Sequence, residues 1–189
     1  MKTLFLDMET QALSSDKGPD GREIGWTLER RGMMGASWAC AATDTGLMLH
    51  YCWQEMDKLA SRLEHADLVV SFNGKSFDLP LLSAVVEREV QVQRHCDLMD
   101  FVKRSLGHRL SLDQLAHINL GTGKTGHGGH APTLYREERY GALAAYCARD
   151  VEILRDLYYL GLSRGALDAP GGRKILTPRV QLQCRQVAA

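Results

Sequence analysis

The segment TLFLDMET, residues 3–10, places two acidic residues inside an otherwise apolar run. Read as a β-strand, it turns its leucines and its methionine to one face and both acids, Asp7 and Glu9, to the other. Two neighbouring carboxylates repel each other, and burying them near a core costs on the order of several kcal/mol each unless something compensates. An exposed edge strand would keep both acids in water. The apolar neighbours favour a central strand instead, with a divalent cation such as Mg²⁺ or Mn²⁺ as the compensating charge.

The rest of the chain alternates between strand and helix patterns. The chain has 189 residues, 44% of them hydrophobic, which suits one globular domain with its own core. Further strands are predicted at 35–43, 46–53, 66–72 and 90–96. Helices are predicted at 55–65, 77–89, 97–106, 111–119 and about 136–160. This order predicts α/β or α+β layering, with a domain over residues 1–165 and an extended C-terminal tail over residues 166–189 that could add an edge strand.

Composition excludes several classes of protein. Twenty-three basic and twenty-three acidic residues cancel, so no net charge draws the chain to nucleic acid or to an anionic membrane, although a local basic groove is compatible with this. The five cysteines are scattered and form no C-x-x-C pair, which argues against a disulfide framework or a zinc module. The acids of residues 3–10 interrupt the apolar run too early for a signal peptide, and no run is long enough to span a membrane. We therefore expect a cytoplasmic protein with reduced thiols and no membrane partner.

Two later segments offer further acidic residues. Asp78 follows a predicted strand and the turn at Asn73, and it begins a helix, which it would cap if it had no other role. Tyr146 and Asp150 lie one turn apart on the same face of the long predicted helix. Taken alone, Asp150 is most simply a solvated residue on the polar face of that helix.

Taken together and in order, three short motifs resemble those of a known superfamily. LFLDMET, residues 4–10, resembles the first motif of the DEDD (DnaQ-like) 3′–5′ exonucleases. NGKSFD, residues 73–78, resembles the second motif, and YCARD, residues 146–150, resembles the third motif of the tyrosine subclass. The histidine subclass would have His where Ala145 stands. The ordered set spans residues 4 to 154.

Within that superfamily, the chain most resembles the compact ribonuclease H-like domains of the YprB type. The similarity lies in LVVSFNGKSFDLPLL (68–82), HCDLMDFVKR (95–104) and LSLDQLAHINLG (110–121). The proofreading domains of family B DNA polymerases share the SLDQLA part of the last segment. The resemblance implies a ribonuclease H-like α/β fold, in which a mixed central sheet has the first strand in its middle and helices on both sides.

The resemblance also implies an activity and a set of site residues. Four carboxylates would bind two divalent cations, Mg²⁺ or Mn²⁺, for the hydrolysis of phosphodiester bonds at the 3′ end of single-stranded DNA or RNA: Asp7, Glu9, Asp78 and Asp150. Tyr146 would orient the attacking water. Other residues near the motifs are candidates for substrate contact: Asn73, Lys75, Phe77 and, on a glycine-rich loop, Lys124.

Other interpretations stay open. A non-catalytic nucleic-acid-binding or scaffold module on the same fold would not need the complete acidic set. A structure-specific endonuclease is the third candidate, although a ribonuclease H proper would lack the Tyr-x3-Asp motif. GTGKT, residues 121–125, is not a phosphate-binding loop, because Ile118 stands where that pattern requires glycine. Asp97 and Asp100 begin a predicted helix; they could lie near the active site, but complementing the helix dipole is the simpler interpretation.

Overall fold

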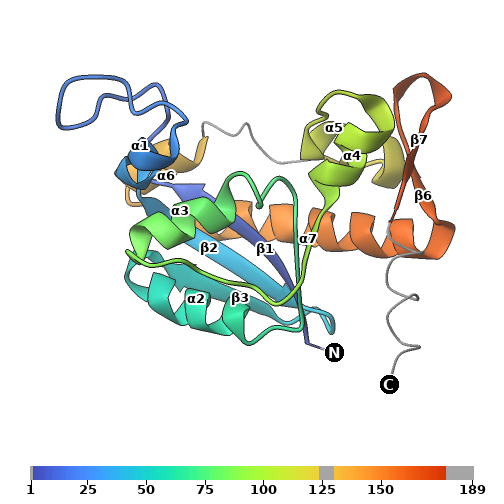
Figure 1. The fold of residues 1–189 in the computed structure, drawn as a ribbon, viewed down its shortest axis with the longest axis horizontal. Coiled ribbons are helices and arrows are strands. Elements are labelled where there is room, and N and C mark those ends of the chain that lie inside the picture. Colours follow the sequence, from blue (N-terminus) through green and yellow to red (C-terminus); the bar gives the residue numbers. More distant parts are fainter. Residues whose placement is uncertain (1, 124–129, 178–189) are drawn as a thin grey trace.

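The computed structural model describes residues 2–123 and 130–177, and its centre is a mixed five-stranded sheet (Figure 1). The strands follow the order β3-β2-β1-β4-β5. Their bounds are β1 Thr3–Thr10, β2 Ala36–Thr43, β3 Met48–Cys52, β4 Leu68–Ser71 and β5 His95–Asp97. Strand β1 runs antiparallel to β2 and parallel to β4. The expected fold class is therefore confirmed, with the first strand in the middle of the sheet.

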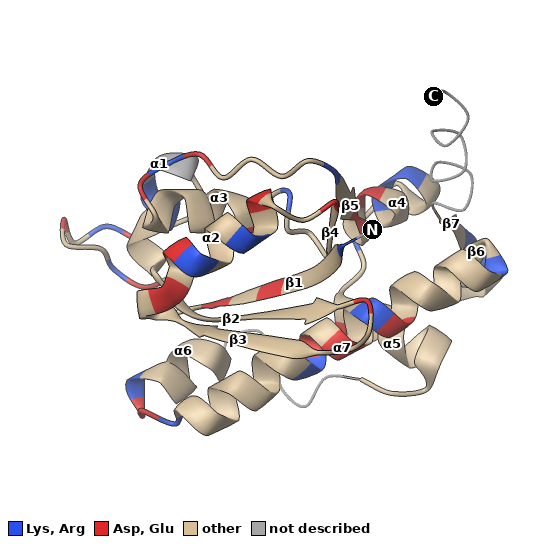
Figure 2. Cartoon of the chain, turned by 90° about the horizontal axis from the view of Figure 1, so that it is seen from below, with Lys and Arg blue, Asp and Glu red and all other residues tan. Residues whose placement is uncertain are grey.

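The two faces of β1 bury side chains in two separate cores, which explains its apolar sequence. Leu4, Leu6 and Met8 pack with α2 (Met56–Glu64) and α3 (Asp78–Val85). Phe5 lies in the core on the opposite face, with side chains of α4 (Leu98–Leu106), α5 (Leu112–Leu120) and α7 (Tyr140–Arg164). Seen from below, α2 and α3 lie on one side of β1–β3 and α7 on the other, so the acidic positions of β1, drawn in red, lie between two layers of helices (Figure 2).

Several helix ends follow from local sequence. Ser111 begins α5 with a reciprocal cap: its hydroxyl accepts from the backbone N–H of Gln114 at 3.1 Å, and its own N–H donates to the Gln114 side chain at 2.9 Å. Gly165 ends α7 in the left-handed conformation, with φ of 77°. No helix within the described residues has the length and hydropathy that a membrane span requires.

The region before the third motif differs from the prediction of one helix over about 136–160. A short helix, α6 (His130–Arg136), comes first, and α7 begins only at Tyr140. The backbone of Glu138 has a φ of 54°, which an α-helix does not allow, so the two helices are separate. The sequence analysis did not predict α6, because the glycine-rich residues before it resemble a loop. Pro132 is compatible with this helix because it lies in the first turn, where proline is tolerated.

The described C-terminal residues pack against the domain. Strands β6 (Ala166–Asp168) and β7 (Lys174–Leu176) form a two-stranded antiparallel sheet of their own, apart from the central sheet. Leu167 and Ile175 are buried in the core shared with α7. The Thr177 hydroxyl donates to the carbonyl of Gly161 at 2.7 Å, which fixes the end of this segment on α7. The short α1 (Leu28–Arg31) lies in the expected long connection between β1 and β2.

Candidate functional site

Asp7 and Glu9 meet a third potential ligand from the long helix. A carboxylate oxygen of each acid and the thiol of Cys147 all lie within 4.8 Å of one another. Strand β1 supplies the two acids, which are two residues apart and so face the same way. Helix α7 crosses this face of the sheet and supplies Cys147, the second residue of the YCARD motif. The first and third motifs, 140 residues apart in sequence, are therefore adjacent in space.

Cys147 is the member of this group that the sequence analysis did not single out. Its thiol donates to the backbone carbonyl of Asp7 at 3.5 Å and lies 3.9 Å from the carboxylate of the same residue. Burial raises the pKa of the Cys147 thiol well above its ordinary value, and neighbouring Cys40 and the two acids raise it further. The sequence did hold a signal, since Cys147 precedes Asp150 by three residues and so shares its helix face.

Asp78, at the start of α3, also contacts strand β1. Its carboxylate accepts a hydrogen bond from the backbone N–H of Met8 at 2.9 Å, between the two acids of the first motif. Strands β1 and β4 pair only as far as Phe5 and Val70, so this part of β1 has no β4 residue beside it. The side chain of Asp78, which is 3% exposed, supplies the acceptor that a continued strand would have supplied.

Tyr146 and Asp150 occupy the buried face of α7. They are 5% and 2% exposed, so the alternative of a solvated Asp150 is excluded. The ring of Tyr146 lies 6.1 Å from that of His130, at the start of α6, in an edge-to-face arrangement. Asp150 lies one turn after Tyr146 and three residues after Cys147, so the three side chains share one broad face of α7.

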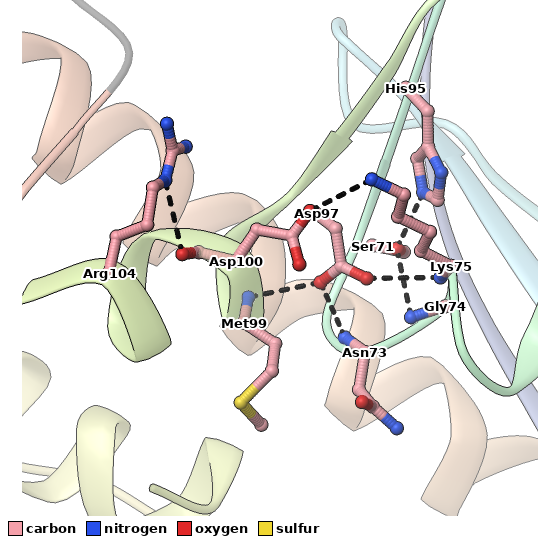
Figure 3. Close-up of polar contacts among 9 residues, drawn as sticks. All are labelled: Ser71, Asn73, Gly74, Lys75, His95, Asp97, Met99, Asp100 and Arg104. Carbon is pink, nitrogen blue, oxygen red and sulfur yellow. Dashed lines mark hydrogen bonds and ion pairs between the residues drawn. The ribbon is translucent and has the colours of Figure 1, made fainter. Parts of the chain in front are cut away.

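The turn that leads to Asp78 is held by a second carboxylate, that of Asp97 (Figure 3). One Asp97 oxygen accepts from the backbone N–H of Asn73 at 2.7 Å, and the other accepts from that of Lys75 at 3.0 Å. Asp97 also caps α4 by accepting from the N–H of Met99 at 3.0 Å. The expected role at the helix start is confirmed, and the contacts with the turn also place Asp97 beside the segment that carries Asp78, as the alternative held.

Ser71 and His95 provide a second set of contacts at this turn. The Ser71 hydroxyl lies 2.8 Å from Nε2 of His95 and accepts from the N–H of Gly74 at 3.2 Å. Burial lowers the pKa of His95, which favours a neutral ring. A Cβ on Gly74 would lie 2.4 Å from the Ser71 hydroxyl and 3.1 Å from the Asp78 carboxylate, so only glycine fits.

Three of the four predicted substrate-contacting residues, Asn73, Lys75 and Phe77, belong to the same turn. Asn73 has a φ of 70°, and its amide oxygen has no hydrogen-bond partner among the residues that the structure describes. The side chain of Asn73 points away from Asp97 (Figure 3). The Lys75 ammonium is exposed and lies 3.3 Å from the carboxylate of Asp100. Phe77 packs in the core beside α3, and Lys124 lies outside the described residues.

The donor set at the site suits a hard divalent cation. Carboxylate oxygens are the ligands that Mg²⁺ and Mn²⁺ prefer, and two of them lie within 4.8 Å of each other beside a thiol. Glu9, Asp78 and Asp150 are all buried. Removing several carboxylates from water in one region is costly without positive charge, so a cation binding there would relieve that cost.

Comparisons with known proteins identify the family and the fold of the chain. The search of curated protein sequences found no match to the chain. Among solved structures, the family B DNA polymerase of the hyperthermophilic archaeon Pyrobaculum calidifontis is similar, with a TM-score of 0.61 and 15% sequence identity. That match covers 87% of this chain and 26% of the polymerase chain, so the protein spans about a quarter of that relative. A family model described as the RNase_H superfamily matches residues 4–160. The chain therefore belongs to the ribonuclease H superfamily.

Proposed function

We propose that the protein is a metal-dependent 3′–5′ exonuclease of the tyrosine subclass of DEDD enzymes. It would hydrolyse the terminal phosphodiester bond of single-stranded DNA or RNA and release nucleoside monophosphates. One observation carries the proposal: the hydrogen bond from Met8 to Asp78 and the proximity of Cys147 to Asp7 bring parts of all three motifs to one stretch of β1.

Four carboxylates would hold the metal ions: Asp7, Glu9, Asp78 and Asp150. Two bound divalent ions supply charge that stabilises the attacking and leaving oxygens of an in-line displacement at phosphorus. Tyr146, one turn before Asp150, would orient the attacking water with its hydroxyl. The hydrogen bond between Asp78 and Met8 holds that carboxylate against the first motif, and packing of α7 on β1 excludes bulk water beneath it.

The neighbouring turn would bind the end of the nucleic acid. The amide oxygen of Asn73 offers an acceptor to a hydroxyl or amino group of the terminal nucleotide, since it has no hydrogen-bond partner within the described part of the chain. Lys75 would contact a phosphate of the substrate. Its exposed ion pair with Asp100 contributes at most about 1 kcal/mol, so breaking that pair to reach the phosphate costs little. Lys124 is a further candidate for a phosphate contact, and Phe77 supports the site from the core. The net charge of zero fits a small footprint at a strand end.

A cleavage assay distinguishes this proposal from the two alternatives. A 5′-labelled single-stranded DNA or RNA is incubated with the protein in Mg²⁺, in Mn²⁺ and in EDTA. We expect a metal-dependent ladder that shortens from the 3′ end and disappears in Asp7→Asn. The matched control is Asp57→Asn, which removes an exposed carboxylate on α2 and should cleave like the wild type. Binding without cleavage would instead indicate a scaffold module, and internal cuts an endonuclease.

A further inference from the structure

An exposed tryptophan lies next to the turn that carries Asp78. Trp26 is 63% exposed, although side chains of this size and apolarity are usually largely buried. Its ring packs edge-to-face against that of Phe77, with centroids 5.8 Å apart. Phe77 directly precedes Asp78, so the indole contacts the sequence neighbour of a candidate metal ligand.

A buried arginine fixes Trp26 relative to this turn. Arg31 is 8% exposed, and its guanidinium donates to the backbone carbonyl of Trp26 at 3.0 Å and to that of Ser76 at 2.7 Å. One side chain therefore joins the connection between β1 and β2 to the turn before α3. Trp26 and Asp78 are held in one local framework, although they are 52 residues apart in sequence.

The segment before Trp26 is also ordered by side-chain contacts. The guanidinium of Arg30 pairs with the carboxylate of Asp20 at 2.6 Å and donates to the carbonyl of Ile24 at 3.2 Å. This partner lowers the pKa of Asp20 to about 2. The backbone N–H of Gly25 donates to the carbonyl of Ser14 at 2.7 Å. The exposed indole is thus presented by a segment with fixed geometry, which lowers the entropy cost of binding a ligand on it.

We propose that Trp26 is a stacking platform for a nucleobase at the 3′ end of single-stranded nucleic acid. This inference rests on the proposed function, since it assigns a binding residue to the same site. Aromatic side chains bind single strands because every base offers a flat face to stack on, largely without regard to sequence. Since the net charge of the chain is zero, stacking supplies affinity that long-range electrostatic attraction cannot.

The test measures binding and cleavage separately. Binding uses an oligonucleotide of mixed sequence, as DNA and as RNA, with the Asp7→Asn protein in Ca²⁺ so that cleavage is not required. Tryptophan fluorescence should fall on binding, and Trp26→Phe in the same background should abolish most of the change. Trp26→Ala should raise Kd, and KM of the active enzyme, by about 5- to 100-fold with little change in kcat, whereas Trp26→Phe should retain most of the affinity.

Leu47→Ala is the matched control, because Leu47 is 61% exposed on the turn between β2 and β3 and should leave Kd and KM unchanged. If wild type cleaves and Trp26→Ala keeps its KM and Kd, the stacking role is wrong while the exonuclease proposal stands. If no cleavage occurs in any metal but Trp26 fluorescence still reports single-strand binding, the exonuclease proposal is wrong while the stacking role stands. A fall in kcat alone would also overturn the stacking role.

Discussion

The carboxylate of Asp78 accepts a hydrogen bond from the backbone N–H of Met8 at 2.9 Å. The bond joins the start of α3 to the centre of β1, between Asp7 and Glu9 in sequence. It forms where the pairing of β1 with β4 has ended. The same carboxylate thus has a structural role on the strand and a proposed role as a metal ligand, and substitutions can separate the two.

Asp78→Asn should abolish activity while preserving the fold. The asparagine oxygen can still accept from Met8, so the free energy of unfolding should change little. Activity in Mn²⁺ should fall by about 100-fold or more, since even residues behind the ligands of a metal site cost 10- to 100-fold. Urea denaturation and the cleavage assay measure the two effects. Asp78→Ala should lose activity and also about 1–3 kcal/mol of stability, because the buried N–H of Met8 loses its acceptor. Full activity in Asp78→Asn would show that Asp78 is not a metal ligand.

Tyr146→Phe should lower kcat without unfolding the protein. The variant keeps the buried ring and loses only the hydroxyl that would orient water. We expect a reduction of roughly 10- to 1,000-fold in kcat, as for other groups that align or stabilise reacting atoms. Tyr158→Phe is the control, because Tyr158 is also buried on α7 but packs against Phe5, with ring centroids 5.4 Å apart. Equal kcat values for the two variants would show that the Tyr146 hydroxyl has no part in the reaction.

Cys147→Ala should change the preference for metals more than the activity in Mg²⁺. Mg²⁺ takes oxygen ligands, so loss of the thiol should alter cleavage in Mg²⁺ by less than about threefold. Cd²⁺ and Zn²⁺ accept sulfur, and their inhibition of the Mg²⁺ reaction should weaken by about tenfold or more. Cys96→Ala, which removes a thiol from β5, should leave this inhibition unchanged. If Cys147→Ala remains folded but loses Mg²⁺-dependent cleavage, the thiol is required for activity in Mg²⁺ and the prediction is wrong.

Asp97→Asn should destabilise the turn that carries Asn73 and Asp78. The Asp97 carboxylate accepts from three backbone N–H groups, of Asn73, Lys75 and Met99, and an amide cannot accept at its nitrogen. We expect a loss of about 1–3 kcal/mol in the free energy of unfolding. Asp100→Asn removes the exposed ion pair with Lys75 and one charge from the first turn of α4, and should cost about 1 kcal/mol or less. Denaturant melts of the two variants give the comparison, and equal stabilities would contradict the importance of the Asp97 contacts.

The sequence predicts the centre of this fold better than its periphery. The apolar residues on both faces of residues 3–10 require cover on both sides, and the structure places β1 in the middle of the sheet with helices on each face. The helix at His130–Arg136 was not predicted, because the glycine-rich sequence before it resembles a loop and its stability comes from packing. Ala131 and Leu134 of this helix are buried with Leu143 and Tyr146 of α7.

In the candidate site, too, the residues whose roles depend on packing between distant segments are the ones that the sequence did not predict. The resemblance to three ordered motifs of a known superfamily is what marks Asp7, Glu9, Asp78 and Asp150 as site residues. Helical spacing places Cys147 on the face of Asp150, but its contact with Asp7 joins distant segments and is a property of the folded chain, as are the contacts of Asp97 with the turn. The exposure of Trp26 is likewise a property of the folded chain, since a tryptophan in a sequence is most often buried.

The central claim is that the acids of the three motifs form one metal site. Anomalous scattering from crystals of the wild-type protein soaked in Mn²⁺ tests it most directly. We predict two Mn²⁺ peaks bounded by the carboxylates of Asp7, Glu9, Asp78 and Asp150, and loss of at least one of them in Asp7→Asn. Mn²⁺ peaks only elsewhere on the molecule, or none beside these four residues at saturating Mn²⁺, would contradict the account.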